Sequence, residues 1–190
     1  VSDNFVLDIS HMGIFKAILD RAELSPEDRA SLAGYISEKN KHEAKKLLDE
    51  RNVSPENAER ILSLVSLYGP IDSVMDKLSS ICTDDVSSSS LAELRSLCEL
   101  LKTTEFYSHL RFDFSVVNDM NYYNGIVFRG FIADIPEGVL SGGRYDSLMK
   151  KMGKRSGAIG FALYLDLLEG MGDEKKAYDV DVLLIYDDTI

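Results

Sequence analysis

The spacing of the apolar residues changes once along this chain, near residue 107. Between residues 11 and 103 they recur every three or four positions, which is the spacing of amphipathic helices. From 107 to about 163 they alternate with polar residues or form aromatic and β-branched runs, which is typical of strands. The opening run "NFVLDI" also indicates a strand. We therefore expect an α+β fold in which a helical segment is inserted into an antiparallel sheet.

A helix-start signal occurs twice within the helical segment. "SPED" begins at Ser25 and "SPEN" at Ser54. Each supplies a capping hydroxyl, a proline at the first helical position and an acid near the positive end of the helix dipole. We expect helices over 26–38 and 55–67, with "HEAKKLLDER" between them as another, and a further helix over 71–81.

The remaining stretches of the sequence predict further helices, strands and loops. "YGP" interrupts the helical pattern, and "TDDVSSSS" is expected to be a loop that caps a helix beginning at Leu91. "RFDFSVV" and "YYNGIVFRGFI" indicate strands of an antiparallel meander, and "IPEGVLSGG" supplies the turn back. A short helix around "DSLMKKM" then precedes a strand that passes into a helix at about Leu163.

Composition limits the classes of function. The 190 residues are 45% hydrophobic, which argues against disorder, and the net charge of −11 gives no overall attraction for nucleic acid. No apolar run approaches the roughly 20 residues of a membrane span, and the N-terminus lacks the pattern of a signal peptide. Cys82 and Cys98 fit no metal or redox spacing, so we expect buried thiols and a cytoplasmic protein.

Both ends of the chain suggest a piece of a larger polypeptide. The sequence opens directly on a strand-like run, and "YDVDVLLIY" near its end has the apolar pattern of a strand that needs partners. We expect 1–20 and 104–172 to form one core, 21–103 to be a helical insertion, and 173–190 to be a linker and the start of a following domain.

The stretch "SGGRYD" has two interpretations. Gly142 and Gly143 allow a sharp turn or a close backbone approach to a ligand, and Arg144 offers a planar fork for a carboxylate or phosphate. Residues 144–155 hold five basic residues and one acid, a local charge of about +4 that suits an anion. The alternative is a tight hairpin turn in which Arg144 pairs with Asp146 and the lysines are a solvated surface.

The stretch "NYYNGIVF" is equally open between a hairpin and a pocket wall. Tyr122 and Tyr123 are expected on a strand, pointing to opposite faces, so that one contacts a ligand and the other belongs to the core. We interpret His11, His42 and His109 as structural or surface residues and expect no metal and no cofactor. Taken alone, these residues require no enzyme.

"NDMNYYNGIVF", "SGGRYDSL" and "GAIGFALYLDLL" together resemble the histidyl-tRNA synthetase family, whose core is a class II synthetase fold. The resemblance covers roughly 1–20 and 110–170 and includes the opening "FVLDISHMGIFKAIL". It implies that Tyr123 contacts histidine, and that Gly142, Gly143, Arg144 and Tyr145 form the second wall of that pocket. Motifs 1 and 2 of the family would lie before Val1.

Three departures from the family pattern oppose catalysis. Asn118 stands where the family has a catalytic arginine, whose loss typically costs on the order of 10²–10³ in rate. Leu167 replaces the arginine that contacts the ATP phosphates, and Tyr164 replaces a glycine that leaves room for the nucleotide. The resemblance thus implies a histidine-binding module that has lost adenylation.

Such a module is similar to the synthetase paralogue that regulates ATP phosphoribosyltransferase. That resemblance implies a short-form catalytic subunit as partner, histidine as feedback effector, and a homodimer within a hetero-oligomer, without nucleic acid or membrane. A divergent, active histidyl-tRNA synthetase is the main alternative, and a synthetase-like sensor domain attached to another effector is the third.

Overall fold

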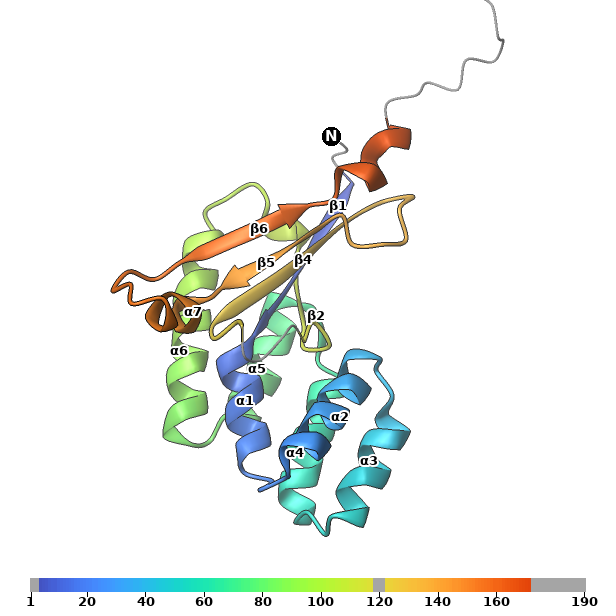
Figure 1. The fold of residues 1–190 in the computed structure, drawn as a ribbon. Helices are drawn as coiled ribbons and strands as arrows, with labels where there is room; N and C mark the ends of the chain where they lie inside the picture. The colour runs from blue at the N-terminus through green and yellow to red at the C-terminus, as the bar shows by residue number, and fades with distance from the viewer. Residues whose placement is uncertain (1–3, 118–121, 172–190) are drawn as a thin grey trace, which may run out of the picture.

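The computed structural model describes residues 4–117 and 122–171 as one mixed α/β unit (Figure 1). The strands are β1 Phe5–His11, β2 Tyr68–Pro70, β3 Leu110–Asp113, β4 Ile126–Ile132, β5 Leu140–Arg144 and β6 Ile159–Leu163. The helices are α1 Met12–Asp20, α2 Pro26–Ser37, α3 Lys41–Glu50, α4 Pro55–Val65, α5 Ile71–Ile81, α6 Asp85–Leu101 and α7 Asp146–Lys151. Two 3₁₀ helices span Tyr107–His109 and Leu165–Met171. The expected strand over "YDVDVLLIY" lies outside the described residues.

The strands form one sheet in the order β2-β3-β1-β4-β5-β6. β4, β5 and β6 are the expected antiparallel meander, and "IPEGV" forms the connection between the first two. The prediction that the strand at "RFDFSVV" belongs to this meander was wrong. β3 pairs with β1 in parallel, and β1 separates it from β4. The opening strand thus sits in the middle of the sheet, because pairing partners far apart in sequence cannot be read from local patterns.

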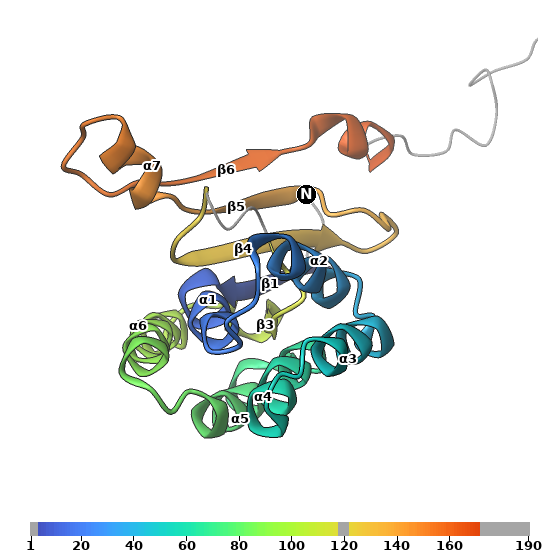
Figure 2. The same ribbon diagram turned by 60° about the horizontal axis from the view of Figure 1, so that its bottom comes forward.

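The helices pack against the strands around one hydrophobic core. Ile9 of β1 and Phe112 of β3 are buried together with Phe15 of α1 and Leu64 of α4. In Figure 2, α3 to α6 gather beyond β1 and β3, while β5 and β6 form the opposite edge of the molecule. The helical residues between β1 and β3 therefore share a core with the sheet. The division into a core and an insertion stays a prediction.

The two helix-start signals behave as expected. Ser25 accepts a hydrogen bond from the backbone N–H of Asp28 at 3.1 Å, and Ser54 accepts one from Asn57 at 3.4 Å. A proline follows each of these serines as the first residue of the helix. The expected helix over 71–81 is also confirmed, as α5.

The predicted interruption at "YGP" is confirmed, and the structure adds that this stretch is a short strand, β2, that pairs with β3 at the edge of the sheet. One prediction within the helical segment was wrong. The serine run is not a loop, because α6 already begins at Asp85 and Asp84 caps it by accepting from the N–H of Ser87 at 2.9 Å. Serine favours helix starts as well as loops, and only the position of the capping carboxylate decides between them. None of the described helices is long and apolar enough to cross a membrane.

Candidate site around a tyrosine cluster

On one face of the sheet, paired residues of β1, β4, β5 and β6 form a row with little side-chain volume. Ser10 of β1 lies opposite Val127 of β4, which lies opposite Gly143 of β5 and, through it, Gly160 of β6. Directly paired residues share a face of the sheet, so these four positions form a row. Gly143 and Gly160 contribute no side chain, which leaves space on that face for rings from the flanking loops.

Three tyrosines occupy that space. The rings of Tyr122 and Tyr123 meet edge to face with their centroids 4.7 Å apart. The ring of Tyr145 lies 5.4 Å from Tyr122 and 6.5 Å from Tyr123. The prediction that the adjacent tyrosines point to opposite faces was wrong, because β4 begins only at Ile126 and the strand alternation does not apply before it.

The exposures of the two tyrosines are the reverse of what we expected. Tyr123, the residue expected to contact the ligand, is the more buried of the two. Tyr122 is 38% exposed, whereas Tyr123 is half-buried and packs against the hydrophobic core. Burial, followed by the neighbouring tyrosines, raises the pKa of Tyr123. Its hydroxyl therefore stays protonated and able to donate a hydrogen bond at neutral pH.

The glycines of "SGGRYD" are needed by packing and not by a turn. Both lie inside β5, so the predicted sharp turn at this point was wrong. A Cβ at Gly143 would stand 2.7 Å from Cδ1 of Tyr123, and one at Gly142 would stand 2.7 Å from the ring of Phe128. A Cβ at Gly160 would be 3.0 Å from the hydroxyl of Tyr145. Gly143 and Gly160 thus let the tyrosines lie directly on the sheet, whereas Gly142 makes room for Phe128 on the other face.

Arg144 follows Gly143 on β5 and so points to the opposite face. Its guanidinium pairs with Glu93 of α6, and its Nε lies 3.0 Å from a carboxylate oxygen of Asp146. The ion pair between Arg144 and Asp146, which the interpretation of "SGGRYD" as a hairpin turn predicts, is thus present. Gly125 leaves room for the guanidinium, since a Cβ there would be 2.7 Å from Nε. Of the five basic residues of the predicted patch, Arg144 is therefore already neutralised, and the rest lie in or after α7.

The three positions that depart from the family pattern are Tyr164, Leu167 and Asn118. Tyr164 follows β6, and its hydroxyl lies 3.0 Å from that of Ser141. Tyr164 also contributes to the raised pKa of Tyr123, which places it near the tyrosine cluster. Leu167 is partly buried in the 3₁₀ helix after β6. Asn118 lies outside the described residues.

Sequence reasoning missed two polar residues on the same face as the cluster. Asp8 and Ser10 are buried on β1, and among the described residues neither Asp8 Oδ1 nor Ser10 Oγ has a hydrogen-bond partner. Burial, with a smaller contribution from the charge of Asp113, raises the pKa of Asp8 to about 6. The alternation of "FVLDISH" could have placed both on one face, but it could not show that this face is covered.

The histidines have structural or surface positions, as expected. His11 is buried, and its Nδ1 accepts from the backbone N–H of Gly13 at 3.1 Å at the start of α1. His109 stacks on Phe5, and His42 is exposed. Cys82 and Cys98 are free and buried, as expected. In residues 4–117 and 122–171, no three metal-binding side chains come together.

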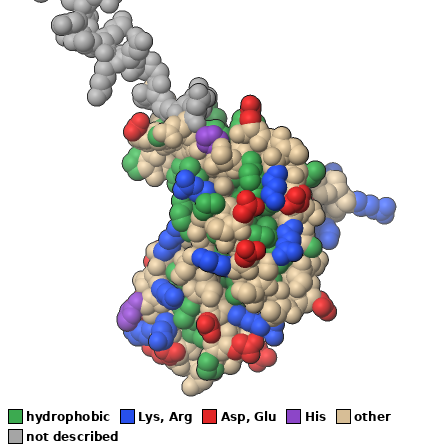
Figure 3. Space-filling view, turned by 180° about the vertical axis from the view of Figure 1, so that it is seen from behind, with side chains coloured by type: hydrophobic (Ala, Val, Ile, Leu, Met, Phe, Trp, Pro, Cys, Tyr) green, Lys and Arg blue, Asp and Glu red, His purple; other side chains and the backbone are tan. Residues whose placement is uncertain are grey.

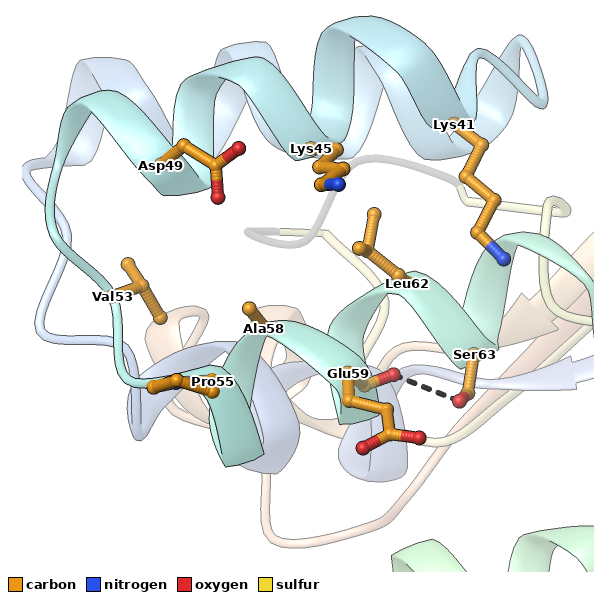
Figure 4. Close-up of a pocket in the computed structure, with 9 residues that line it drawn as sticks. All are labelled: Lys41, Lys45, Asp49, Val53, Pro55, Ala58, Glu59, Leu62 and Ser63. Atoms are coloured by element: carbon orange, nitrogen blue, oxygen red, sulfur yellow. Dashed lines mark hydrogen bonds between the residues drawn. The ribbon is translucent and has the colours of Figure 1, made fainter.

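A separate hollow of about 400 Å³ lies in the helical segment, between α3 and α4 (Figure 4). Lys41 and Lys45 reach from α3 across an apolar floor that includes Leu62. None of the predicted site residues lines it. Seen from behind, the molecule shows basic side chains at the tip near α7, and acidic and basic side chains mixed elsewhere on that face (Figure 3). The clustered tyrosines therefore remain the candidate site.

A six-stranded, mostly antiparallel sheet with helices packed against it, and a tyrosine-lined face built on glycines, define a domain of the class II synthetase type. The family model described as histidyl-tRNA synthetase matches residues 2–168. The chain belongs to that family.

The similar proteins include both regulators and synthetases. The chain is 31% identical over 185 residues to a protein of Oceanobacillus iheyensis named ATP phosphoribosyltransferase regulatory subunit, covering 96% of this chain and 46% of that protein. A crystal structure from Bacillus halodurans, described as an ATP phosphoribosyltransferase regulatory subunit/histidyl-tRNA synthetase, matches with a TM-score of 0.79 at 28% identity over 87% of this chain and 44% of that one.

A structure of the HisG:HisZ complex of ATP phosphoribosyl transferase from Thermotoga maritima matches with a TM-score of 0.63 at 17% identity, over 86% of this chain and 54% of that one. At this identity the match supports the fold alone. The chain spans about half the length of the curated relatives that it matches.

Proposed function

We propose that this chain belongs to a regulatory subunit of ATP phosphoribosyltransferase, which performs no chemistry itself. The names of the similar proteins support the assignment. The observation that carries the proposal is a contrast between two sets of residues. Tyr122, Tyr123 and Tyr145 form a ring-lined surface, whereas apolar Leu167 stands where a phosphate-binding arginine is expected. An apolar side chain cannot pair with a phosphate.

In this proposal the ligand of the tyrosine cluster is histidine. Aromatic rings that meet edge to face against a glycine-rich strand form a partly apolar surface suited to an imidazole ring, and the protonated hydroxyl of Tyr123 can donate to a nitrogen acceptor. Histidine would regulate the complex only if it binds one state of the complex more tightly than another. Arg144 is paired with Glu93, so it contributes less to the ligand than the resemblance implies.

The proposal also specifies the partner subunit, the oligomeric state and the compartment. The catalytic partner is a short-form ATP phosphoribosyltransferase subunit, by analogy with the HisG:HisZ complex of Thermotoga maritima. We further propose a homodimer within a hetero-oligomer, located in the cytoplasm, with neither nucleic acid nor membrane as partner. The buried free thiols of Cys82 and Cys98 are consistent with a reducing compartment.

Two assays on the full-length protein test the proposed role. Histidine-dependent ATP–pyrophosphate exchange should stay at background, whereas adding the protein to a short-form catalytic subunit should raise phosphoribosyl transfer and make it sensitive to histidine. Exchange clearly above background would instead establish the alternative, a divergent histidyl-tRNA synthetase. If neither activity nor a complex were found, only a sensor role would remain.

The hydroxyl of Tyr123 can be tested separately. Tyr123→Phe keeps the ring that packs on the core but removes the donor, so histidine affinity measured by calorimetry should fall about fivefold to tenfold, the value of one hydrogen bond. Tyr122→Phe is the matched control and should change affinity less. An unchanged affinity in the Tyr123 variant would remove that residue from the site.

A further inference from the structure

The hollow between α3 and α4 has the size of a small-molecule site. Its volume of about 400 Å³ lies within the range of roughly 300–1,000 Å³ that is common for ligand pockets. α3 forms one wall and α4 the other, and Val53 lies in the connection that joins them at one end (Figure 4). The walls and the floor are thus made by one helical hairpin within the described chain.

The floor of the hollow is apolar and held in place by the core. Val53, Ala58 and Leu62 are partly buried, and all three pack against the hydrophobic core. Ala58 and Leu62 are four residues apart on α4, so they lie one above the other on the same face of that helix. The apolar part of a ligand that lies on this floor is removed from water, which favours binding.

Two lysines of α3 extend over one end of this floor. Lys41 and Lys45 are four residues apart, so they project from the same face of the helix, and both reach toward α4 in Figure 4. Lys46, the next residue, points elsewhere and pairs with Glu43. Neither Lys41 nor Lys45 forms an ion pair with a carboxylate of the described residues, so both ammonium groups can accept an anion.

A second hollow of about 270 Å³ adjoins the first and adds another lysine. Lys41 and Ser63 line both hollows, and Lys77 of α5 lines the second. Lys77 also lacks an ion pair with any carboxylate in residues 4–117 and 122–171. The joined hollows therefore have a locally positive end, although the net charge of the whole chain is −11.

The acidic residues of the first hollow restrict what it can bind. Asp49 extends into the end that lies beyond Lys45, whereas Glu59 directs its carboxylate away from α3 (Figure 4). The charge of Asp49 repels a second negative group at that end of a ligand. The hollow therefore suits a molecule that carries its negative charge at one end and an apolar body behind it.

We propose that the hollow between α3 and α4 binds a small organic anion. Its carboxylate or phosphate contacts the ammonium groups of Lys41 and Lys45, and its apolar body lies on Ala58 and Leu62. Lys77 strengthens the attraction from the adjoining hollow. This site shares no residue with the tyrosine cluster, and the proposal does not depend on the regulatory role.

Titration of the full-length protein with matched anions tests both halves of the site. Binding is read from the NMR signals of the methyl groups of Val53 and Leu62. Hexanoate should bind about tenfold more tightly than acetate, because it adds four methylene groups that are partly buried on the floor. Phenyl phosphate against inorganic phosphate makes the same comparison for a phosphate, and hexylamine, which carries the opposite charge, should not bind.

The outcomes of these titrations are distinct. A preference for the longer molecule in one pair only identifies the charged group as a carboxylate or a phosphate. Equal affinities within both pairs would overturn the proposal, because the apolar floor would then contribute nothing. Hexylamine binding as tightly as hexanoate would also overturn it, because the lysines would then not select the charge.

A matched pair of variants provides a second readout. Lys45→Gln and Lys46→Gln remove the same charge from neighbouring exposed positions of α3, but only Lys45 lines the hollow. Lys45→Gln should weaken binding of the tighter anion about threefold to fivefold, whereas Lys46→Gln should change it less than about 1.5-fold. Equal effects of the two variants would show that the anion responds only to overall charge, and would contradict a site in the hollow.

Discussion

Asp8 is the most unusual single residue of the described chain. It is only 7% exposed and stands between Arg111 and Arg129 on the neighbouring strands. No hydrogen bond to its Oδ1 is made by the described residues. The cost of burying the charge exceeds the attraction of the nearby cations, so the pKa rises from 3.8 to about 6.

This pKa predicts how stability depends on pH. The folded state binds the Asp8 proton more tightly than the unfolded state does. The contribution of Asp8 to the free energy of unfolding is therefore fully present below pH 3.8 and is lost as pH rises through about 6. A shift of about two units corresponds to roughly 3 kcal/mol.

Asp8→Asn should remove this dependence. Above pH 6 the variant should be more stable than the wild type, by at most about 3 kcal/mol, and below pH 4 the advantage should vanish. Urea unfolding of the full-length protein at a series of pH values measures both limits. Asp76→Asn, at an exposed position on α5, is the control and should follow the wild type. Parallel curves for wild type and Asp8→Asn would show that the carboxyl titrates normally.

At the scale of the element, β5 requires a glycine at position 142, whereas α2 does not require one at position 34. A Cβ at Gly142 would meet the ring of Phe128 at 2.7 Å and the backbone carbonyl of Gly160. A Cβ at Gly34, inside α2, would meet no atom within 4 Å. Close packing thus requires the first glycine, whereas the second only weakens its helix.

Gly142→Ala and Gly34→Ala should therefore shift stability in opposite directions. The first should lower the free energy of unfolding by about 1–3 kcal/mol, because backbone and ring must move apart. The second should raise it by about 0.5–1 kcal/mol, because alanine favours the helix and restricts the unfolded chain. Chemical denaturation measures both. A destabilising Gly34→Ala would show that the exposed face of α2 is covered in the full-length protein.

Helices were more predictable than strand pairing for a physical reason. The cap at Ser25 and the proline after it lie within a few residues of the bonds that they affect, so α2 could be placed from the sequence. The pairing of β3 with β1 joins residues about 100 positions apart, and no local pattern encodes that contact. The prediction that Tyr122 and Tyr123 lie on a strand was wrong, because β4 begins only at Ile126, after both tyrosines.

At the scale of the whole molecule, the helical segment and the sheet are held by one core. Ile9 of β1 packs in the same cluster as Leu48 of α3 and Leu94 of α6. Glu93 of α6 also pairs with Arg144 on the strand that bears the tyrosine cluster. The helical segment therefore contacts both the centre of the sheet and β5.

The sequence alone determined the α+β class, the helices marked by caps, the glycine–tyrosine motifs and the likeness to the synthetase family. These depend on local spacing and on residue identity. Only the tertiary structure decided that the tyrosines gather on one face, that Arg144 turns to the other, that Asp8 is buried and that β6 is the last strand of the described sheet. Those features arise from pairing between distant strands, which sets the neighbours of every side chain and which a one-dimensional pattern does not specify.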